Sequence, residues 1–198
     1  MKAIVFVDVQ KDFIDGALRN ERAIEVTPKI VEFAKECIAD SNCKIYATRD
    51  THEKTVYEES TCLGQDIATE AKSGYMATLE GHKLPVEHCV EYTEGWMLDT
   101  CLMDVLDGHC KFINKRTFGS FDLANALEED GLGKNEADVH TGEDEIILCG
   151  FCTDICVIAN AVILRAKFPN VKINVMKDLC AGVTNDTHDA SLKVLAMQ

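Results

Sequence analysis

Short runs of apolar residues alternate along the chain with segments of helical periodicity. Continuous apolar runs are typical of buried parallel strands, and they predict strands at residues 3–9, 44–48, 111–114, 145–149 and 171–176. Apolar residues at helical spacing predict helices at residues 23–38, 102–107, 123–129, 154–167 and 188–197. Strands that alternate with helices imply parallel βαβ units. We therefore expect a three-layer α/β fold, a doubly wound parallel sheet with helices on both faces.

The boundaries of these elements carry further expectations. Thr27 and Pro28 suit the cap and first turn of the first long helix. Residues 53–87 have no clear period, so we expect a long loop with a short helix near residues 65–73, and loops this long are usually functional. We expect residues 1–198 to form a single domain. A further strand would normally follow the last helix, so we expect the natural protein to be slightly longer.

Composition and charge narrow the class of protein. Hydrophobic residues make up 46% of the chain and charged residues 27%, which is typical of a globular domain. The net charge of −14 repels phosphate backbones, so we expect no nucleic-acid partner. No apolar stretch is long enough for a membrane helix. We expect a small-molecule substrate, and a homo-oligomer because sheet proteins of this size often associate.

The chain contains ten cysteines, which raises the question of a disulfide framework. The N-terminal apolar run is cut by Asp8 and has no signal-peptide cleavage site, so a reducing cytoplasm and free thiols are the better expectation. Cys149 and Cys152 have the spacing of a zinc or redox pair. They straddle a strand end and Gly150, however, so a packing role is favoured for them.

Polar residues follow the predicted strands at the points where these strands end. They are Asp8, Asp50 with His52, Lys115, and the segment Gly150-Phe-Cys-Thr-Asp-Ile-Cys156. Ligands of an open parallel sheet bind beyond the carboxyl ends of its strands. Four strands that each deliver a reactive group to one edge therefore predict an active site there.

The most reactive of these groups is the thiol of Cys156, at the start of a predicted helix. Free backbone N–H groups and the helix dipole lower a thiol pKa there and hold an oxyanion. Lys115 would lower this pKa further, and Asp8 could accept the thiol proton. Taken singly, each has an ordinary alternative: Cys156 a packed core cysteine, Lys115 a solvated lysine, and Asp8 a strand terminator.

A second group of residues has the chemistry of a metal site. Asp50 and His52 lie two residues apart, and His88 follows in a later loop. One carboxylate and two imidazoles form a facial set with open positions, for which zinc is the ion we expect first, with iron and manganese as alternatives. The alternative is that both histidines are ordinary loop residues. His82, His109 and His140 lie in polar segments and are expected in solvent, whereas His188 caps or packs the last helix.

In these motifs the chain resembles the isochorismatase-like cysteine hydrolases and, among them, the nicotinamidases. The similar segments run in the family's order from end to end: Asp8-Val-Gln-Lys-Asp-Phe13, Thr48-Arg-Asp-Thr-His52, Glu80-Gly-His-Lys-Leu-Pro-Val-Glu-His88, Lys115-Arg-Thr-Phe-Gly119, Gly150-Phe-Cys-Thr-Asp-Ile-Cys156, and Asp178-Leu-Cys-Ala-Gly182 with His188. The first and fifth are the more specific signals. Two departures concern the substrate: Phe118-Gly119 stands where the family often has Tyr-Ser, and the 53–79 loop is longer than usual.

The resemblance implies a role for each matching residue. Asp8, Lys115 and Cys156 take the positions of a catalytic triad, and the N–H groups of Cys152 and Cys156 those of an oxyanion hole. The Phe151–Cys152 peptide takes the position of the family's cis bond. The metal would be held by Asp50, His52 and His88, with Glu80 near it directly or through water. Phe13 and Trp96 would flank a flat aromatic ring.

The activity implied is hydrolysis of nicotinamide to nicotinate and ammonia through a thioester on Cys156. The nearest alternative is another amidase of the superfamily, acting on an N-carbamoyl compound or a different carboxamide; such members often lack the metal residues seen here. A true isochorismatase does not use a nucleophilic cysteine. A catalytically silent binding module would form no thioester. A hydrolase with a metal-bound hydroxide would keep its activity after alkylation of Cys156.

Overall fold

The computed structural model describes residues 1–57, 61–62, 65–66, 71–133 and 144–197. Its centre is a parallel five-stranded sheet in the order β7-β2-β1-β8-β9. The strands are β1 (Lys2–Val7), β2 (Cys43–Asp50), β7 (Cys110–Lys115), β8 (Glu145–Phe151) and β9 (Lys172–Ala181). Central β1 is almost wholly buried, as its unbroken apolar run predicts.

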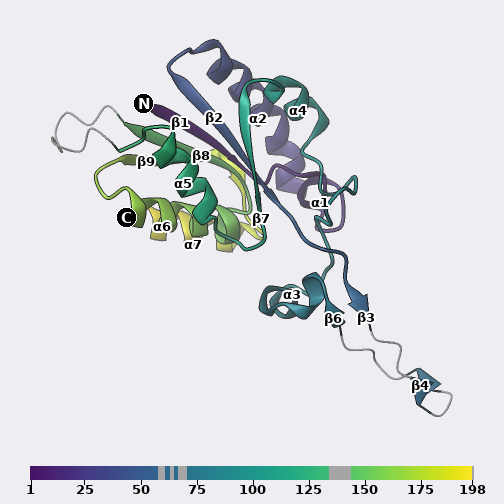
Figure 1. Cartoon of the computed structure of the whole chain (residues 1–198). Helices are drawn as coiled ribbons and strands as arrows, with labels where there is room; N and C mark the ends of the chain where they lie inside the picture. Colours follow the sequence, from purple (N-terminus) through teal and green to yellow (C-terminus); the bar gives the residue numbers. More distant parts are fainter. Residues whose placement is uncertain (58–60, 63–64, 67–70, 134–143, 198) are drawn as a thin grey trace.

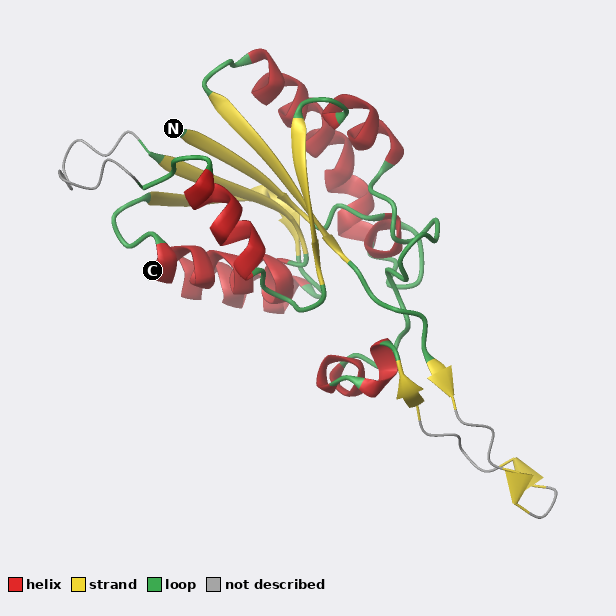
Figure 2. Ribbon diagram, in the orientation of Figure 1, coloured by secondary structure: helices red, strands yellow, loops and turns green. Residues whose placement is uncertain are grey.

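Helices cover both faces of this sheet. Figures 1 and 2 show α2 (Glu21–Ala39) and α4 (Thr100–Leu106) on one face, and α5 (Phe121–Glu129), α6 (Ile158–Lys167) and α7 (Asn185–Leu195) on the other. The short helix α1 (Lys11–Ile14) follows β1 at its carboxyl end. The expected three-layer α/β fold is therefore confirmed. No helix in the described part of the chain is both long and apolar enough to cross a bilayer.

The first long helix begins earlier than its sequence pattern suggests. Asn20 caps α2, with its side-chain oxygen accepting hydrogen bonds from the N–H groups of Arg22 and Ala23, and Pro28 lies inside the helix. The prediction that Thr27 and Pro28 form the cap and first turn is wrong, because Asn20, eight residues before Pro28, already satisfies the free N–H groups at the helix start. Thr27 instead donates its hydroxyl hydrogen to the carbonyl oxygen of Ala23.

The aperiodic segment after β2 leaves the body of the molecule and returns to it. It contains the antiparallel pair β3 (Val56–Tyr57) and β6 (Ala71–Ser73), the smaller pair β4 (Thr61–Cys62) and β5 (Gln65–Asp66), a 3-10 turn η1 (Tyr75–Ala77), and helix α3 (Leu79–Lys83). The expected short helix near residues 65–73 is contradicted where the structure describes that stretch, because both described pieces pair as strands. Residues 67–70 lie outside the described part.

The nine cysteines whose side chains are described are all free thiols, as expected. Of the remaining histidines, His82 and His109 are exposed, and His140 lies outside the described residues. His188 is buried in α7, where its Nδ1 lies 2.8 Å from the hydroxyl of Thr153. It therefore packs the last helix against the turn that follows β8, which agrees with its expected packing role.

Candidate active site

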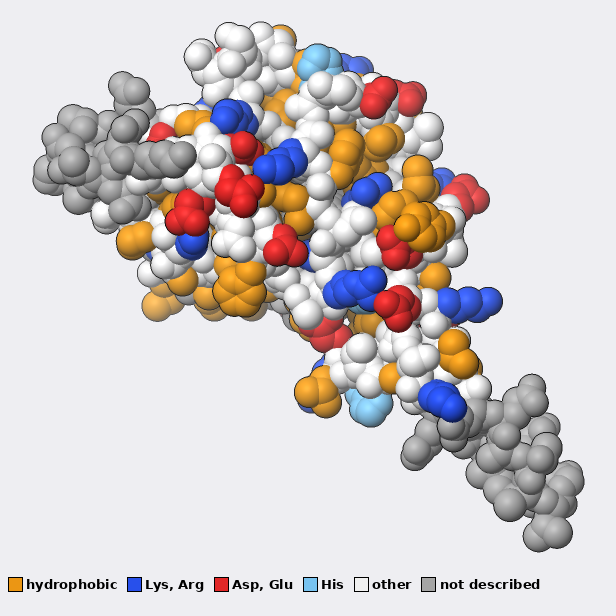
Figure 3. Space-filling view, in the orientation of Figure 1, with side chains coloured by type: hydrophobic (Ala, Val, Ile, Leu, Met, Phe, Trp, Pro, Cys, Tyr) orange, Lys and Arg blue, Asp and Glu red, His pale blue; other side chains and the backbone are white. Residues whose placement is uncertain are grey.

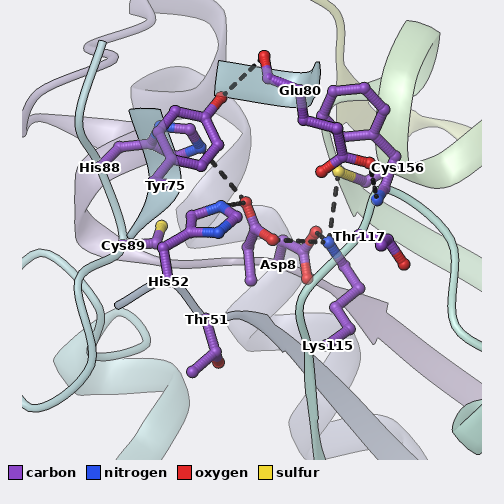
Figure 4. Close-up of polar contacts among 12 residues, drawn as sticks. Asp8, Thr51, His52, Tyr75, Glu80, His88, Cys89, Lys115, Thr117 and Cys156 are labelled. Atoms are coloured by element: carbon purple, nitrogen blue, oxygen red, sulfur yellow. Dashed lines mark hydrogen bonds and ion pairs between the residues drawn. The ribbon is translucent and has the colours of Figure 1, made fainter. Parts of the chain in front are cut away.

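Four side chains from four elements meet beyond the carboxyl ends of the strands. Asp8 follows β1, Asp50 ends β2, Lys115 ends β7, and Cys156 lies in a π-helical turn, η2 (Thr153–Val157), after β8. Sheet register places Asp50 directly beside Lys115. None of the four is more than 3% exposed, and Figure 4 shows the labelled members pointing toward one another. The polar cluster predicted at this edge is therefore present, and it is buried.

Lys115 lies at the centre of this cluster. Its Nζ is 2.7 Å from Oδ2 of Asp8, 3.2 Å from Oδ1 of Asp50 and 3.5 Å from Sγ of Cys156. A buried ammonium group is costly unless carboxylates compensate its charge, and here two of them do. Lys115 is therefore a buried cation that contacts the thiol, and the solvated-lysine alternative is wrong.

The charges in this cluster shift one another's protonation. Burial raises the pKa of the Asp8 carboxyl above its usual range; Lys115 opposes this shift and Asp50 adds to it. Burial alone would lower the pKa of Lys115, but the negative charges around it raise that pKa well above its usual value. Burial also acts to raise the pKa of Asp50, yet Lys115 and the two histidines hold it below the ordinary range. Lys115 and Asp50 are therefore charged at neutral pH.

The thiol of Cys156 differs from the expectation. Burial raises its pKa well above the ordinary value; the nearby Lys115 ammonium lowers it only in part, while Asp8 and Asp50 raise it further. The thiol is therefore protonated in the protein alone, and the expected net lowering of its pKa is wrong. A nucleophile in this state needs a base beside it, and Asp8 shares its contact with Lys115.

Asp8 is held in an unusual backbone conformation. Its φ is 50°, in the left-handed region that a non-glycine residue seldom adopts outside functional sites. Its N–H group donates to the carbonyl oxygen of Thr48, and the Thr48 hydroxyl donates to Oδ1 of Asp8 at 2.7 Å. These contacts fix one carboxylate oxygen and leave Oδ2 directed at Lys115.

The turn that carries Cys156 is shaped by close packing. Gly150 has a φ of 120°, and a Cβ atom there would lie 2.1 Å from the carbonyl oxygen of Val7, so only glycine allows β8 to approach β1 here. The Phe151–Cys152 peptide is cis, as the family resemblance implied. Asn160, fully buried in α6, donates to the carbonyl oxygen of Cys156 at 2.8 Å and accepts from the N–H of Ser120.

Asp50, His52 and His88 form a compact set of possible metal ligands. One ligand atom from each lies within 4.8 Å of the others, and all three residues are buried. Oδ2 of Asp50 is 2.9 Å from Nε2 of His52 and 3.2 Å from Nε2 of His88. Gln10 holds the backbone of Asp50 from both sides, because its side chain accepts from the N–H and donates to the C=O of that residue.

The chemistry of this donor set fits a divalent cation. Nδ1 of His88 lies 2.7 Å from the carbonyl oxygen of Val86, which can only accept a hydrogen bond. Nδ1 therefore donates to that carbonyl oxygen, which leaves Nε2, the ring nitrogen beside Asp50, as the atom that can bind a metal. A carboxylate and two imidazoles, one with its tautomer fixed in this way, suit zinc, iron or manganese.

A cavity of about 380 Å³ opens beside both groups of residues. Cys156, Cys152, Asp50 and His88 contribute to its lining, so the thiol and the ligand set face one space. Its apolar lining comes from several elements: Phe13, Ala17, Leu18, Leu84, Phe118, Ile155 and Val183. Arg19 and Asn20 complete it. The cavity therefore combines apolar surfaces with a thiol and a set of possible metal ligands, as a small-molecule site does.

Comparison with known proteins decides the family. The isochorismatase domain family matches residues 2–198. The chain belongs to that family. No curated protein sequence matches it.

Solved structures share the fold of this isochorismatase domain. A nicotinamidase from Bacillus subtilis is 22% identical, with a TM-score of 0.73 over 97% of this chain and 92% of that one. A pyrazinamidase from Pyrococcus horikoshii in complex with zinc is 21% identical, with a TM-score of 0.72 over 99% and 94%. An N-carbamoylsarcosine amidase from Thermoplasma acidophilum is 18% identical, with a TM-score of 0.69 over 98% and 92%. At such identities these likenesses show a common fold.

One residue assigned to the site by resemblance, Trp96, lies elsewhere in this isochorismatase domain. The Trp96 indole N–H donates to the hydroxyl of Thr51, and its ring packs 4.2 Å from the Arg49 guanidinium, outside the set of residues that line the cavity. Leu84 lies in the cavity with Phe13 instead. The Glu80 carboxylate lies outside the compact ligand set and accepts a hydrogen bond from the N–H of Phe118, which lines the cavity; its expected approach to a metal stays a prediction.

Sequence patterns also missed residues that shape the site. Gln10 and Asn160 are fully buried polar residues among apolar neighbours, and that contrast is a signal that could have found them. Leu84 and Tyr75 come from the aperiodic loop and carried no such signal. Tyr75 is 1% exposed, and its ring packs against both His52 and His88.

Proposed function

We propose that this isochorismatase-family protein is a cysteine amidohydrolase that converts nicotinamide to nicotinate and ammonia. The observation that carries the proposal is the contact of one buried lysine with both Asp8 and the thiol of Cys156, in a cavity that Asp50 and His88 also line. Such a cavity offers a nucleophile, a proton acceptor and a cation beside a possible metal centre. The shared fold with a nicotinamidase and a zinc-bound pyrazinamidase supports this choice.

In the first half of the reaction, the Asp8 carboxylate accepts the proton of the Cys156 thiol. The thiolate, beside the Lys115 ammonium, attacks the carboxamide carbon and forms a C–S bond. Negative charge moves to the carbonyl oxygen, which we place near the backbone N–H groups of Cys152 and Cys156. The C–N bond then breaks, and the leaving nitrogen takes the proton from Asp8 and departs as ammonia.

The second half releases the acid from the resulting thioester. Asp8, again ionised, accepts a proton from water as the water oxygen attacks the thioester carbon. The C–S bond breaks, and the proton returns to the sulfur of Cys156, which restores the thiol. The high pKa of that thiol in the free protein agrees with a proton that shuttles between sulfur and carboxylate.

Asp50, His52 and His88 would hold a divalent cation, zinc first, beside this reaction. When bound, the cation supplies a Lewis acid for a ring nitrogen of the substrate and so orients the ring. Phe13 and Leu84 would then contact the ring itself. On this proposal the ligand set contributes chiefly to substrate choice, and Cys156 to bond cleavage.

An N-carbamoyl amino acid is the second candidate substrate. Arg19 lines the cavity and could pair with a substrate carboxylate, which nicotinamide lacks; in the free protein it pairs with Glu21. The shared fold with an N-carbamoylsarcosine amidase supports this alternative.

The nine free thiols support a reducing cytoplasmic compartment. A homo-oligomer stays a prediction.

Ammonia release tests the proposal directly. Protein loaded with zinc should release ammonia from nicotinamide, and removal of zinc by a chelator should raise KM or abolish turnover. Cys156→Ala should lower turnover by roughly 10³-fold or more with unchanged zinc content. Cys37→Ala, which removes a buried thiol on α2, is the matched control and should keep activity.

Two outcomes would contradict parts of this proposal. Substantial activity in Cys156→Ala would exclude the nucleophile and favour a metal-bound hydroxide. Release of ammonia from N-carbamoylsarcosine but not from nicotinamide, at every metal loading, would transfer the assignment to the second substrate.

A further inference from the structure

Tyr75 lies where the ligand set and the substrate cavity meet, although it belongs to the long segment between β2 and α4. The chain leaves the body after Thr55 and returns at Gly74, next to its point of departure. A Cβ atom on Gly74, which has a φ of 84°, would lie 2.4 Å from the carbonyl oxygen of Lys54. The N–H of Tyr75 donates to the carbonyl oxygen of Glu53, one residue after His52. The backbone of Tyr75 is thereby attached to the strand end that carries the ligands.

The ring of Tyr75 packs against both histidines. Its centroid is 4.2 Å from that of His52 and 4.8 Å from that of His88, and the second pair meets edge to face. His88 also contacts Phe13 and has the hydrogen bond to Val86 that fixes its tautomer. Among the described residues, the His52 ring makes one hydrogen bond, to Asp50. Ring packing is therefore the main constraint on the orientation of His52.

The hydroxyl of Tyr75 points away from the ligand set, toward α3. It donates to the carbonyl oxygen of Leu84 at 3.0 Å and lies 3.4 Å from that of Glu80 (Figure 4). Leu84 lines the cavity, and the Glu80 carboxylate accepts from the N–H of Phe118, another lining residue. Through this hydroxyl, Tyr75 connects Leu84 in the cavity wall with the two histidines on which its own ring packs.

We propose that Tyr75 is a positioning residue with two separable roles: its ring holds His52 and His88 in orientation for a metal, and its hydroxyl holds Leu84 against the substrate. The second role deepens the proposed function and rests on it where substrate binding is concerned. Neither role makes Tyr75 a ligand, since its oxygen is engaged with the carbonyl groups of α3. Tyr75, from the segment between β2 and α4, thus supplies the support that a divalent-metal site needs around its ligands.

Two substitutions separate the roles. Tyr75→Phe keeps the ring and removes the hydroxyl, whereas Tyr75→Leu removes both. Zinc affinity, measured by competition with a chromophoric chelator, should stay within about twofold in Tyr75→Phe and fall by about 10- to 100-fold in Tyr75→Leu. The visible spectrum of the cobalt-substituted protein should change only in the leucine variant. Rescue by phenylalanine would identify the ring as the positioning element.

The role of the hydroxyl is measured at the cavity. Iodoacetamide should alkylate Cys156 several-fold faster in Tyr75→Phe than in the unmodified protein, because the wall at Leu84 is released. KM for nicotinamide should rise several-fold with little change in kcat. Tyr46→Phe is the matched control: Tyr46 is equally buried, and its hydroxyl bonds Asp130, near the other end of β2. Tyr46→Phe should change neither the alkylation rate of Cys156 nor KM for nicotinamide.

The outcomes distinguish failure of this proposal from failure of the proposed function. Unchanged zinc affinity and cobalt spectrum in a folded Tyr75→Leu protein, or no zinc binding by the unmodified protein, would overturn the role of the ring. An unchanged alkylation rate in Tyr75→Phe would overturn the role of the hydroxyl. If zinc affinity and alkylation respond as expected but nicotinamide is not hydrolysed, the positioning roles hold and the substrate assignment fails. Thermal melting of each variant confirms that it folds.

Discussion

Lys115 faces two buried carboxylates, so the cluster of Asp8, Asp50 and Lys115 carries one excess negative charge when all three groups are ionised. The pKa values reflect this imbalance, since that of Asp8 is raised while that of Asp50 is held low. Asp8 is therefore the carboxyl of the pair that is more easily protonated, which suits a group that accepts a proton in the reaction. The same imbalance makes Asp8 costly to the fold.

Asp8→Asn should consequently stabilise the protein while it abolishes turnover. We expect the free energy of unfolding at pH 7 to rise by about 1 kcal/mol, and Tm by roughly 2–4 °C. Because the pKa of Asp8 is raised in the folded state, its contribution to stability is fully present below its unfolded pKa of about 3.9 and is lost as pH rises through the folded pKa. The advantage of Asp8→Asn should therefore grow with pH in urea titrations.

Lys115→Met should have the opposite effect, because it leaves two carboxylates buried without their cation. We expect a loss of about 3–5 kcal/mol in the free energy of unfolding at pH 7. Lys111→Met, at an exposed position of the same strand, should change it by no more than about 0.5 kcal/mol. Equal losses of stability in Lys115→Met and Lys111→Met, or destabilisation by Asp8→Asn, would contradict an excess negative charge in the cluster of Asp8, Asp50 and Lys115.

At the scale of elements, the excursion between Thr55 and Gly74 is separable from the site that it adjoins. Its described end residues Val56, Tyr57, Lys72 and Ser73 are exposed, whereas Thr55 and Tyr75 on either side of them are buried. The close approach of Gly74 to Lys54 and Thr55 brings the two ends of the excursion together. Removal of such a segment leaves only a short gap to close.

Replacing residues 56–73 with a Gly-Ser linker should therefore preserve zinc content and change kcat/KM for nicotinamide by no more than about twofold. The comparison variant is Gly81→Ala in α3, where a Cβ atom would lie 2.2 Å from the carbonyl oxygen of Tyr75. This change should raise KM several-fold, because it pushes α3 away from the cavity. His82→Ala, on the exposed side of α3, should have no effect. An unchanged KM in Gly81→Ala, or loss of activity when residues 56–73 are replaced, would contradict the view that α3 supports the site and residues 56–73 do not.

At the scale of the whole molecule, the net charge of −14 sets the field that substrates meet. On the face drawn in Figure 3, acidic and basic side chains are interspersed. The excess of acid therefore acts on approaching molecules as a weak field, which salt screens. A neutral amide experiences little of this field, whereas an anionic carbamoyl compound is repelled.

The salt dependence of kcat/KM should consequently separate the two candidate substrates. Between about 10 and 100 mM salt the Debye length falls from about 30 to 10 Å. Over this range kcat/KM for nicotinamide should stay nearly constant, and any value for N-carbamoylsarcosine should rise. A fall for the anionic compound would instead show that attraction by Arg19 at the cavity outweighs the field of the whole chain.

The layered parallel fold could be predicted from the sequence alone, because buried strands that alternate with one-sided apolar helices pack as parallel βαβ units. The sequence also predicted which strand ends carry Asp8, Asp50, Lys115 and Cys156, since parallel strands present their carboxyl ends at one edge. It did not locate the start of α2, where the Asn20 cap outweighs the signal of Pro28. Local patterns are informative here because the spacing of apolar residues within one element identifies the face that this element buries.

How these groups act together depends on contacts that form only in the folded chain. The thiol pKa depends on burial and on three charges from separate strands, and no local pattern contains that sum. The positions of Trp96, Leu84 and Tyr75 depend on where an aperiodic segment returns to the sheet, which is a matter of long-range packing. Spacing along the chain predicted the reactive groups, and the folded contacts decided their protonation, their support and the shape of the cavity.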